Sequence, residues 1–163
     1  MKKFKLTSEF IVDISGVKLF RIKALIEFGN VKAGDLGGYI EKEENLSHMG
    51  DAWVSDDARI SGDAQVFGNA RVSGNARVSG DAQVFDDARV SGDKDYAYAH
   101  GFGSCNRTTT FFRLRDGGVG VRCGCFYGTL AQFRDKVRET HGETKKAQEY
   151  LMLADLMELR FKD

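Results

Sequence analysis

The sequence predicts a mainly β protein, in which a rod of stacked coils is preceded by a hairpin and followed by a small α+β domain. Three observations lead to this fold class. A six-residue phrase recurs from Ala52 onward, the flanking segments carry alternating and helical apolar patterns, and the 163 residues include 19 glycines and no proline. Self-similarity at a fixed period is stronger evidence for a fold than local propensity, so the repeat decides the fold class.

The repeat unit reads A-[RQW]-[VI]-[SF]-[GD]-[DN]. In each copy the Ala and the Val or Ile two residues later share one face of a short strand, and the residues after each of them share the other. Small and aliphatic side chains therefore point inward and mostly polar ones outward. The Gly-Asp and Gly-Asn pairs supply the corners, because they adopt left-handed backbone conformations. The copies begin at Ala52, Ala58, Ala64, Ala70, Ala76, Ala82 and Ala88.

The repeat also carries a longer period of eighteen residues. Three six-residue sides close a triangular coil, so residues eighteen apart are expected to stack. In agreement with this, AQVFGN at residues 64–69 returns as AQVFDD at residues 82–87. The register predicts three outward columns, which are Met49, Phe67 and Phe85; Trp53, Arg71 and Arg89; and Arg59, Arg77 and Asp95.

This phrase resembles the hexapeptide repeat of left-handed parallel β-helix proteins, in which an aliphatic residue is followed four positions later by a small one. Val66 and Ala70 match that pattern, and the three following copies match it in the same way. The resemblance covers roughly residues 46–99. It implies that the rod is a short left-handed parallel β-helix.

Two further segments complete the predicted architecture. Residues 1–28 are expected to form an N-terminal β-hairpin cap, because EFIVDI and VKLFRIKAL flank the turn residues Ser15 and Gly16. The β-helix is expected to span residues 29–99, beginning with an irregular coil that uses Leu36 and Ile40. The segment DYAYAHGFGSCNR then breaks the repeat and is expected to be a junction.

Residues 100–163 are expected to form a C-terminal α+β domain of ββαα type. Two alternating strands flank Asp116-Gly117-Gly118, and Thr129 begins a helix with Gln132 in the capping-box position. A second amphipathic helix spans about residues 144–159, and its apolar stripe is expected to dock on the strands. The strand face expected to point into the core carries Val119, Val121, Cys123 and Cys125.

Long segments at both ends resemble uncharacterised phage and prophage proteins that join hexapeptide repeats to a small C-terminal domain. These segments are residues 21–54 and 123–161. The resemblance implies a phage or bacterial origin, and it brings no established activity with it.

Charge and hydropathy narrow the expected partners and compartment. Lys plus Arg and Asp plus Glu both number 24, so no overall charge excess attracts duplex nucleic acid or an anionic membrane. No apolar run suits a signal peptide or a membrane span, which predicts a cytoplasmic protein, in the host cytoplasm if it is encoded by a phage. The odd count of three cysteines predicts free thiols.

The three histidines are the residues considered as a general base or as zinc ligands. Left-handed β-helix proteins include acyltransferases that use acyl-CoA and a histidine base, and here His100 in YAHGFGS is the candidate. His48 is expected to have a structural or capping role and His141 to end a helix. Relatives that are carbonic anhydrases hold zinc with three converging histidines, whereas these three are scattered. Because Cys123 and Cys125 are predicted to be core residues, neither a metal site nor a cofactor is expected.

The outward aromatic and arginine columns predict binding instead. Aromatic rings interleaved with guanidinium groups suit nucleobases and phosphates. The hypothesis is a non-catalytic homo-oligomer, a trimer along the coil faces, that holds a nucleotide signal or a host defence protein between subunits. An acyltransferase and a structural spacer that presents the C-terminal domain stay open as alternatives. The candidate ligand-binding residues are Trp53, Phe67, Arg71, Arg77, Phe85, Arg89 and Tyr96.

Overall fold

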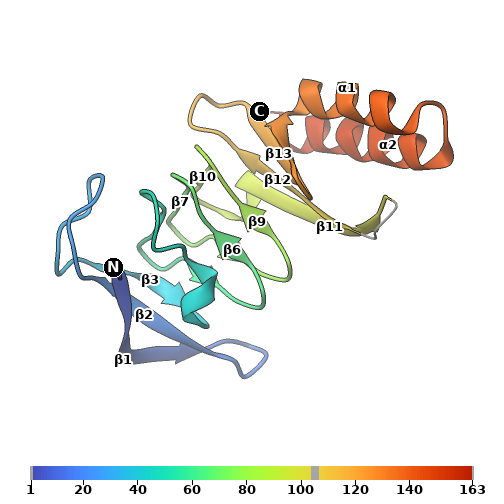
Figure 1. Cartoon of the computed structure of the whole chain (residues 1–163). Coiled ribbons are helices and arrows are strands. Elements are labelled where there is room, and N and C mark those ends of the chain that lie inside the picture. Colours follow the sequence, from blue (N-terminus) through green and yellow to red (C-terminus); the bar gives the residue numbers. More distant parts are fainter. Residues whose placement is uncertain (1, 104–106, 163) are drawn as a thin grey trace.

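The computed structural model describes residues 2–103 and 107–162, and it is mainly β with two C-terminal helices (Figure 1). Neither helix of these residues is long and apolar enough to cross a membrane. The elements are β1 (Phe4–Val12), β2 (Lys18–Ala24), β3 (Leu36–Ile40), η1 (Glu43–Asn45), β4 (Trp53–Val54), β5 (Arg59–Ile60), β6 (Gln65–Val66), β7 (Arg71–Val72), β8 (Arg77–Val78), β9 (Gln83–Val84), β10 (Arg89–Val90), η2 (Asp93–Asp95), β11 (Tyr96–Phe102), β12 (Arg107–Arg113), β13 (Val119–Cys123), β14 (Phe126–Thr129), α1 (Leu130–His141) and α2 (Lys145–Arg160).

Parallel pairing of two-residue strands builds the repeat region. Strands β4, β7 and β10 pair in parallel, as do β5 with β8 and β6 with β9. Each pair joins residues eighteen apart, such as Trp53 with Arg71 and Arg71 with Arg89, so the predicted stacking period is confirmed. The predicted third column is wrong at its end, because Asp95 lies in η2 and its carboxylate accepts hydrogen bonds from Ser91.

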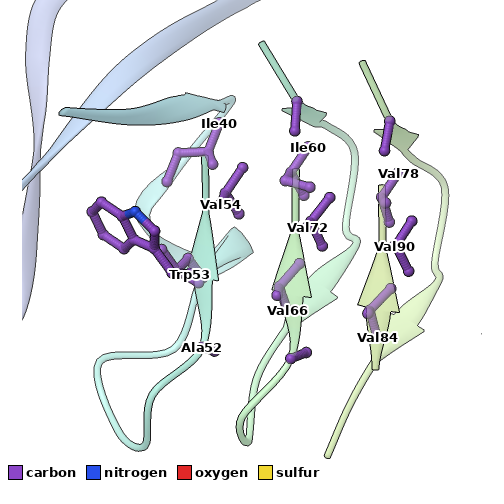
Figure 2. Packing of buried hydrophobic residues seen from close by; sticks show 14 of the residues in the cluster. Ile40, Ala52, Trp53, Val54, Ile60, Val66, Val72, Val78, Val84 and Val90 are labelled. Atoms are coloured by element: carbon purple, nitrogen blue, oxygen red, sulfur yellow. The ribbon is translucent and has the colours of Figure 1, made fainter. Parts of the chain in front are cut away.

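The inward positions form a continuous core. Figure 2 shows Ile60, Val66 and Val72 of one coil pointing toward one another, with Val78, Val84 and Val90 in the next coil. The alanines of the repeat are as fully buried as these aliphatic residues. Ile40 joins this core as expected, whereas Leu36 is exposed, so the expectation that Leu36 packs in the first coil is wrong.

The corners recur every six residues with positive φ. Most are glycines, and two are aspartates with φ of 55°. Asp56 tolerates this conformation while its carboxylate accepts a hydrogen bond of 3.0 Å from the backbone N–H of Gly74 in the next coil. The corner residues are Gly50, Asp56, Gly62, Gly68, Gly74, Gly80 and Asp86.

The predicted hairpin is present at the N-terminal end. β1 and β2 pair antiparallel, and the turn is closed by backbone hydrogen bonds at Asp13, with Gly16 at φ 84°. β2 continues antiparallel onto β3, which pairs in parallel with β5. The hairpin strands therefore extend one of the solenoid sheets.

The C-terminal part has four antiparallel strands, in the order β11, β12, β13 and β14, rather than the predicted two. Residues 96–102 of the segment expected to be a junction form β11, in which the alternating Tyr and Ala residues at 96–99 pair with residues 109–112 of β12. The predicted core position of Cys125 is also wrong. Gly124, with φ of 58°, turns the chain after Cys123, so that Cys125 is exposed in the loop before β14.

Both faces of this sheet are covered. Phe111 points toward α1 and α2, whereas the next residue, Phe112, joins the core of the solenoid. Thr129 caps α1 in a capping box with Gln132, as predicted, and Thr144 caps α2. Figure 1 shows the helices on the side of the sheet that faces away from the coils. The sheet thus closes the last coil and carries the helices.

Candidate anion-binding groove

The structure distributes the seven candidate binding residues over several environments. Trp53 is 4% exposed and meets Phe28 edge-on at 5.3 Å between ring centroids. Tyr96 is 8% exposed, and its hydroxyl accepts a hydrogen bond from the Ser79 backbone. Both side chains therefore belong to the core and offer little surface to a ligand.

The phenylalanine column is covered by the chain itself. Phe67 and Phe85 stack at 4.5 Å, and the guanidinium of Arg122 on β13 lies over both rings. Tyr127 on β14 meets Phe85 edge-on at 5.1 Å and donates a hydrogen bond of 2.7 Å to Asp86. The C-terminal sheet thus packs on two members of the column.

Two further residues of the predicted outward columns are exposed. Met49, the first member of the predicted phenylalanine column, is 80% exposed. Arg77 is exposed on another solenoid face, where it borders a hollow beside Arg59 and the turn of the N-terminal hairpin. This placement separates Arg77 from the other candidate arginines.

The arginine column lines an open groove of about 500 Å³. Arg71 and Arg89 reach it from β7 and β10, one coil apart, because their residues pair in the parallel ladder. Arg115 arrives from the turn between β12 and β13, where its backbone N–H donates to the carbonyl oxygen of Asp87. The lining residues are Asn30, Asp51, Asn69, Arg71, Asp87, Arg89 and Arg115.

Neighbouring groups hold two of these guanidinium groups in place. Arg71 donates a hydrogen bond of 2.7 Å to the side chain of Asn30. Arg89 donates to the backbone carbonyl oxygens of Asn69 at 3.0 Å and Ala88 at 2.9 Å. Ordered guanidinium groups lose less conformational entropy when they bind a ligand, so the groove is pre-organised.

The electrostatics of the groove favour an anion. Its lining carries three arginines against two aspartates. Burial, followed by the positive charge of Arg89, lowers the pKa of Arg71, while Asp51 opposes this shift. An anion between these guanidinium groups offsets the cost of burying them and reduces their mutual repulsion.

A buried lysine adds to the positive charge near this groove. Lys3 is 1% exposed, and its ammonium donates a hydrogen bond of 2.6 Å to the carbonyl oxygen of Ala52. Burial lowers the pKa of Lys3 to about 8, with Asp51 raising it and Arg71 lowering it further. Lys3 is therefore close enough to the two groove residues Asp51 and Arg71 for its pKa to change when a charged ligand binds there.

An acidic hollow adjoins the groove and shares Asp87 and Arg115 with it. Its remaining lining is Asp86, Leu114, Asp116 and Tyr127, around a volume of about 480 Å³. The groove is richer in guanidinium donors, with three arginines, and the hollow is richer in carboxylate acceptors, with three aspartates. This arrangement suits a ligand that carries both an anionic group and hydrogen-bond donors.

The histidines lie outside this groove. The exposed His100 bonds to the Thr108 hydroxyl at 2.7 Å, and His141 lines a pocket of the C-terminal domain. His48 stacks on Phe4, accepts a hydrogen bond from the Lys3 backbone and contacts Glu43 at 2.9 Å, which is a structural arrangement. Within residues 2–103 and 107–162, no group of three or more His, Cys, Asp or Glu residues is placed to hold a metal ion. Cys105 lies outside the described residues.

Several groove residues were missed in the sequence although a signal existed for some of them. Asp51, Asn69 and Asp87 are spaced by eighteen residues and form a column two positions before Trp53, Arg71 and Arg89. The eighteen-residue period therefore sufficed to find them. No sequence signal placed Arg115, because its position depends on how the C-terminal sheet docks on the last coil.

The comparison with known families agrees with the coil geometry. Residues 64–80 match the YdcK β-solenoid repeat. The matched segment begins at the alanine before β6 and contains β6, β7 and β8, which belong to the three sides of the coil. This match supports a solenoid of the β type. None of the curated proteins compared with the chain matches it.

Proposed function

We propose that this chain is a non-catalytic binding protein whose groove at Arg71, Arg89 and Arg115 takes a small phosphorylated ligand of the nucleotide class. The main support for this proposal is that three guanidinium groups from three separate segments meet in one open groove. Guanidinium groups form paired, charge-assisted hydrogen bonds with phosphate oxygens. The phosphate is expected at these arginines.

The adjoining acidic hollow selects among phosphorylated ligands. Asp87 and Asp116 accept hydrogen bonds from the hydroxyl groups of a ribose or the amino group of a base. Inorganic phosphate uses only the arginines of the groove. A nucleotide is therefore expected to bind more tightly than phosphate at the same ionic strength.

The position of His100 favours a binding function over catalysis. Its imidazole is exposed, outside the arginine groove, and bonded to Thr108. An acyltransferase requires its general base beside the bound acyl group. The acyltransferase alternative predicts acyl-CoA turnover that disappears in His100→Ala.

The assembly and the origin of the protein are also part of the proposed function. We infer a left-handed coil, a homo-oligomer with three subunits and a phage or prophage origin, with a host nucleotide signal or host defence factor as the target. The exposed apolar residues Ile14 and Met49 supply surface that another copy would cover. Native mass spectrometry tests the subunit number, and a monomer at micromolar concentration would overturn this part.

Isothermal titration calorimetry with a panel of linear and cyclic ribonucleotides tests the binding site. The expected result is binding that weakens at least tenfold in Arg71→Ala and in Arg89→Ala, because each variant loses charge-assisted hydrogen bonds. Arg77→Ala is the matched control, since Arg77 is a solenoid arginine on another face. If no member of the panel binds, or if the groove variants bind as tightly as Arg77→Ala, the proposal is wrong.

A further inference from the structure

The C-terminal domain holds a second pocket, separate from the arginine groove. Its volume is about 250 Å³, and it lies where the turn between β13 and β14 meets α1 and α2. Its lining residues are Arg107, Cys123, Cys125, Phe126, Phe133, Lys136, Val137, Thr140, His141 and Tyr150. None of them lines the arginine groove.

Aromatic rings form the inner wall of this pocket. Phe133 contacts Phe126 at 5.9 Å and Tyr150 edge-on at 5.5 Å between ring centroids. Val137 lies one helical turn after Phe133 and adds aliphatic surface. Phe133 and Tyr150 are themselves buried and support Phe126, whose half-buried ring offers apolar surface to a flat ligand.

Uncharged polar groups lie beside these rings. The Thr109 hydroxyl donates to the Cys123 sulfur at 3.3 Å, and the Tyr150 hydroxyl lies 3.7 Å from the same sulfur. Tyr150 is 4% exposed, and burial raises the pKa of its hydroxyl well above the usual range. A tyrosine hydroxyl is protonated at neutral pH at its ordinary pKa, and this shift keeps it neutral in more alkaline solution as well.

The charged groups of the pocket have one sign. Arg107, Lys136 and His141 are the ionisable nitrogen bases of the lining, and none of the ten lining residues is acidic. Lys136 lies 3.7 Å from Glu139, but both side chains are largely exposed, so water weakens this pair. Arg107 packs over Gly124, where a side chain would collide with the guanidinium.

We propose that this pocket binds a small aromatic carboxylate. The half-buried ring of Phe126, which packs on the buried Phe133, contacts the flat body of the ligand, and Arg107 and Lys136 pair with its carboxylate. Cys125 is an exposed residue of the pocket lining, so a bound ligand is expected to cover its thiol. This inference uses none of the groove residues and is independent of the proposed nucleotide site.

Calorimetry with 2-naphthoate and its uncharged isostere 2-naphthamide tests the proposal. The expected result is that naphthoate binds at least tenfold more tightly than naphthamide, and that Lys136→Gln weakens naphthoate binding severalfold. Thr140→Trp places a large side chain at the pocket and is expected to abolish binding. Ala131→Trp is the matched control, because Ala131 is an exposed α1 residue outside the lining.

A second readout follows the thiol directly. Alkylation of each cysteine by iodoacetamide, resolved by peptide mass spectrometry, is expected to slow at Cys125 when naphthoate is bound. Equal affinity for naphthoate and naphthamide, or unchanged binding in Thr140→Trp, would overturn the proposal. So would a loss of naphthoate binding in Arg71→Ala, because the ligand would then occupy the other groove. Absence of naphthoate binding to the wild-type protein would also overturn it.

Discussion

Replacement of a corner glycine tests whether the coils stack as closely as the structure shows. Gly74 has φ of 61°, and a Cβ atom built there overlaps the carbonyl oxygen of Ser91 in the next coil. Gly74→Ala must therefore accept a left-handed backbone and also displace the neighbouring coil. The left-handed conformation costs a residue with a Cβ about 1–2 kcal/mol. Displacing the coil also weakens nearby backbone hydrogen bonds, such as that from Ser73 to Val90, which contribute about 1 kcal/mol each.

The matched control is Gly16→Ala, in the turn of the N-terminal hairpin. Gly16 has φ of 84°, and its Cβ position meets no atom within 4 Å. This variant has the conformational cost without the collision, so we expect a loss of about 1–2 kcal/mol for Gly16→Ala and about 3–4 kcal/mol for Gly74→Ala. Urea unfolding followed by circular dichroism measures both. A difference below about 1 kcal/mol between the variants would refute the close stacking of the coils at this corner.

Two further changes test the contacts around the groove. The folded chain releases the Lys3 proton near its pKa of about 8, whereas the unfolded chain keeps this proton up to the ordinary lysine pKa. Because the unfolded chain binds more protons between pH 7 and 9.5, the free energy of unfolding should rise by about 2 kcal/mol over this range. Urea titrations at several pH values should show this rise in the wild type and not in Lys3→Met, and identical pH profiles would contradict the burial of Lys3. Tyr127→Phe removes the hydrogen bond to Asp86 and should lower the free energy of unfolding by about 1–2 kcal/mol in the same assay. An unchanged urea midpoint would show that this contact does not hold the sheet to the coil.

The six-residue pattern carried most of the information about the solenoid. Inward Ala and Val positions, corners rich in glycine and the eighteen-residue stacking follow from the period alone, because one physical constraint recurs in every copy. The C-terminal sheet was only half predicted. Tyr96 opens a strand whose pairing with β12 depends on the docked domain, and the turn at Gly124 removes Cys125 from the predicted core face. Local alternation does not reveal either feature.

The candidate site was also predicted only in part from the sequence. Arg71 and Arg89 were found because they occupy equivalent positions in consecutive coils, and the structure brings them to one groove. Phe67 and Phe85 were expected to face a ligand or another subunit, but Arg122 lies over both rings. Their environment depends on a contact with the C-terminal sheet, which no local pattern encodes.

The dissociation constant of the tightest-binding nucleotide for Arg115→Ala tests the central claim most directly. Arg115 lies outside the repeat, and only the docked C-terminal sheet brings it to Arg71 and Arg89. The proposed site predicts a dissociation constant about ten to a hundred times higher for Arg115→Ala than for wild type, with Arg77→Ala unchanged. Equal dissociation constants for Arg115→Ala and the wild-type protein would contradict a nucleotide site built from these three arginines.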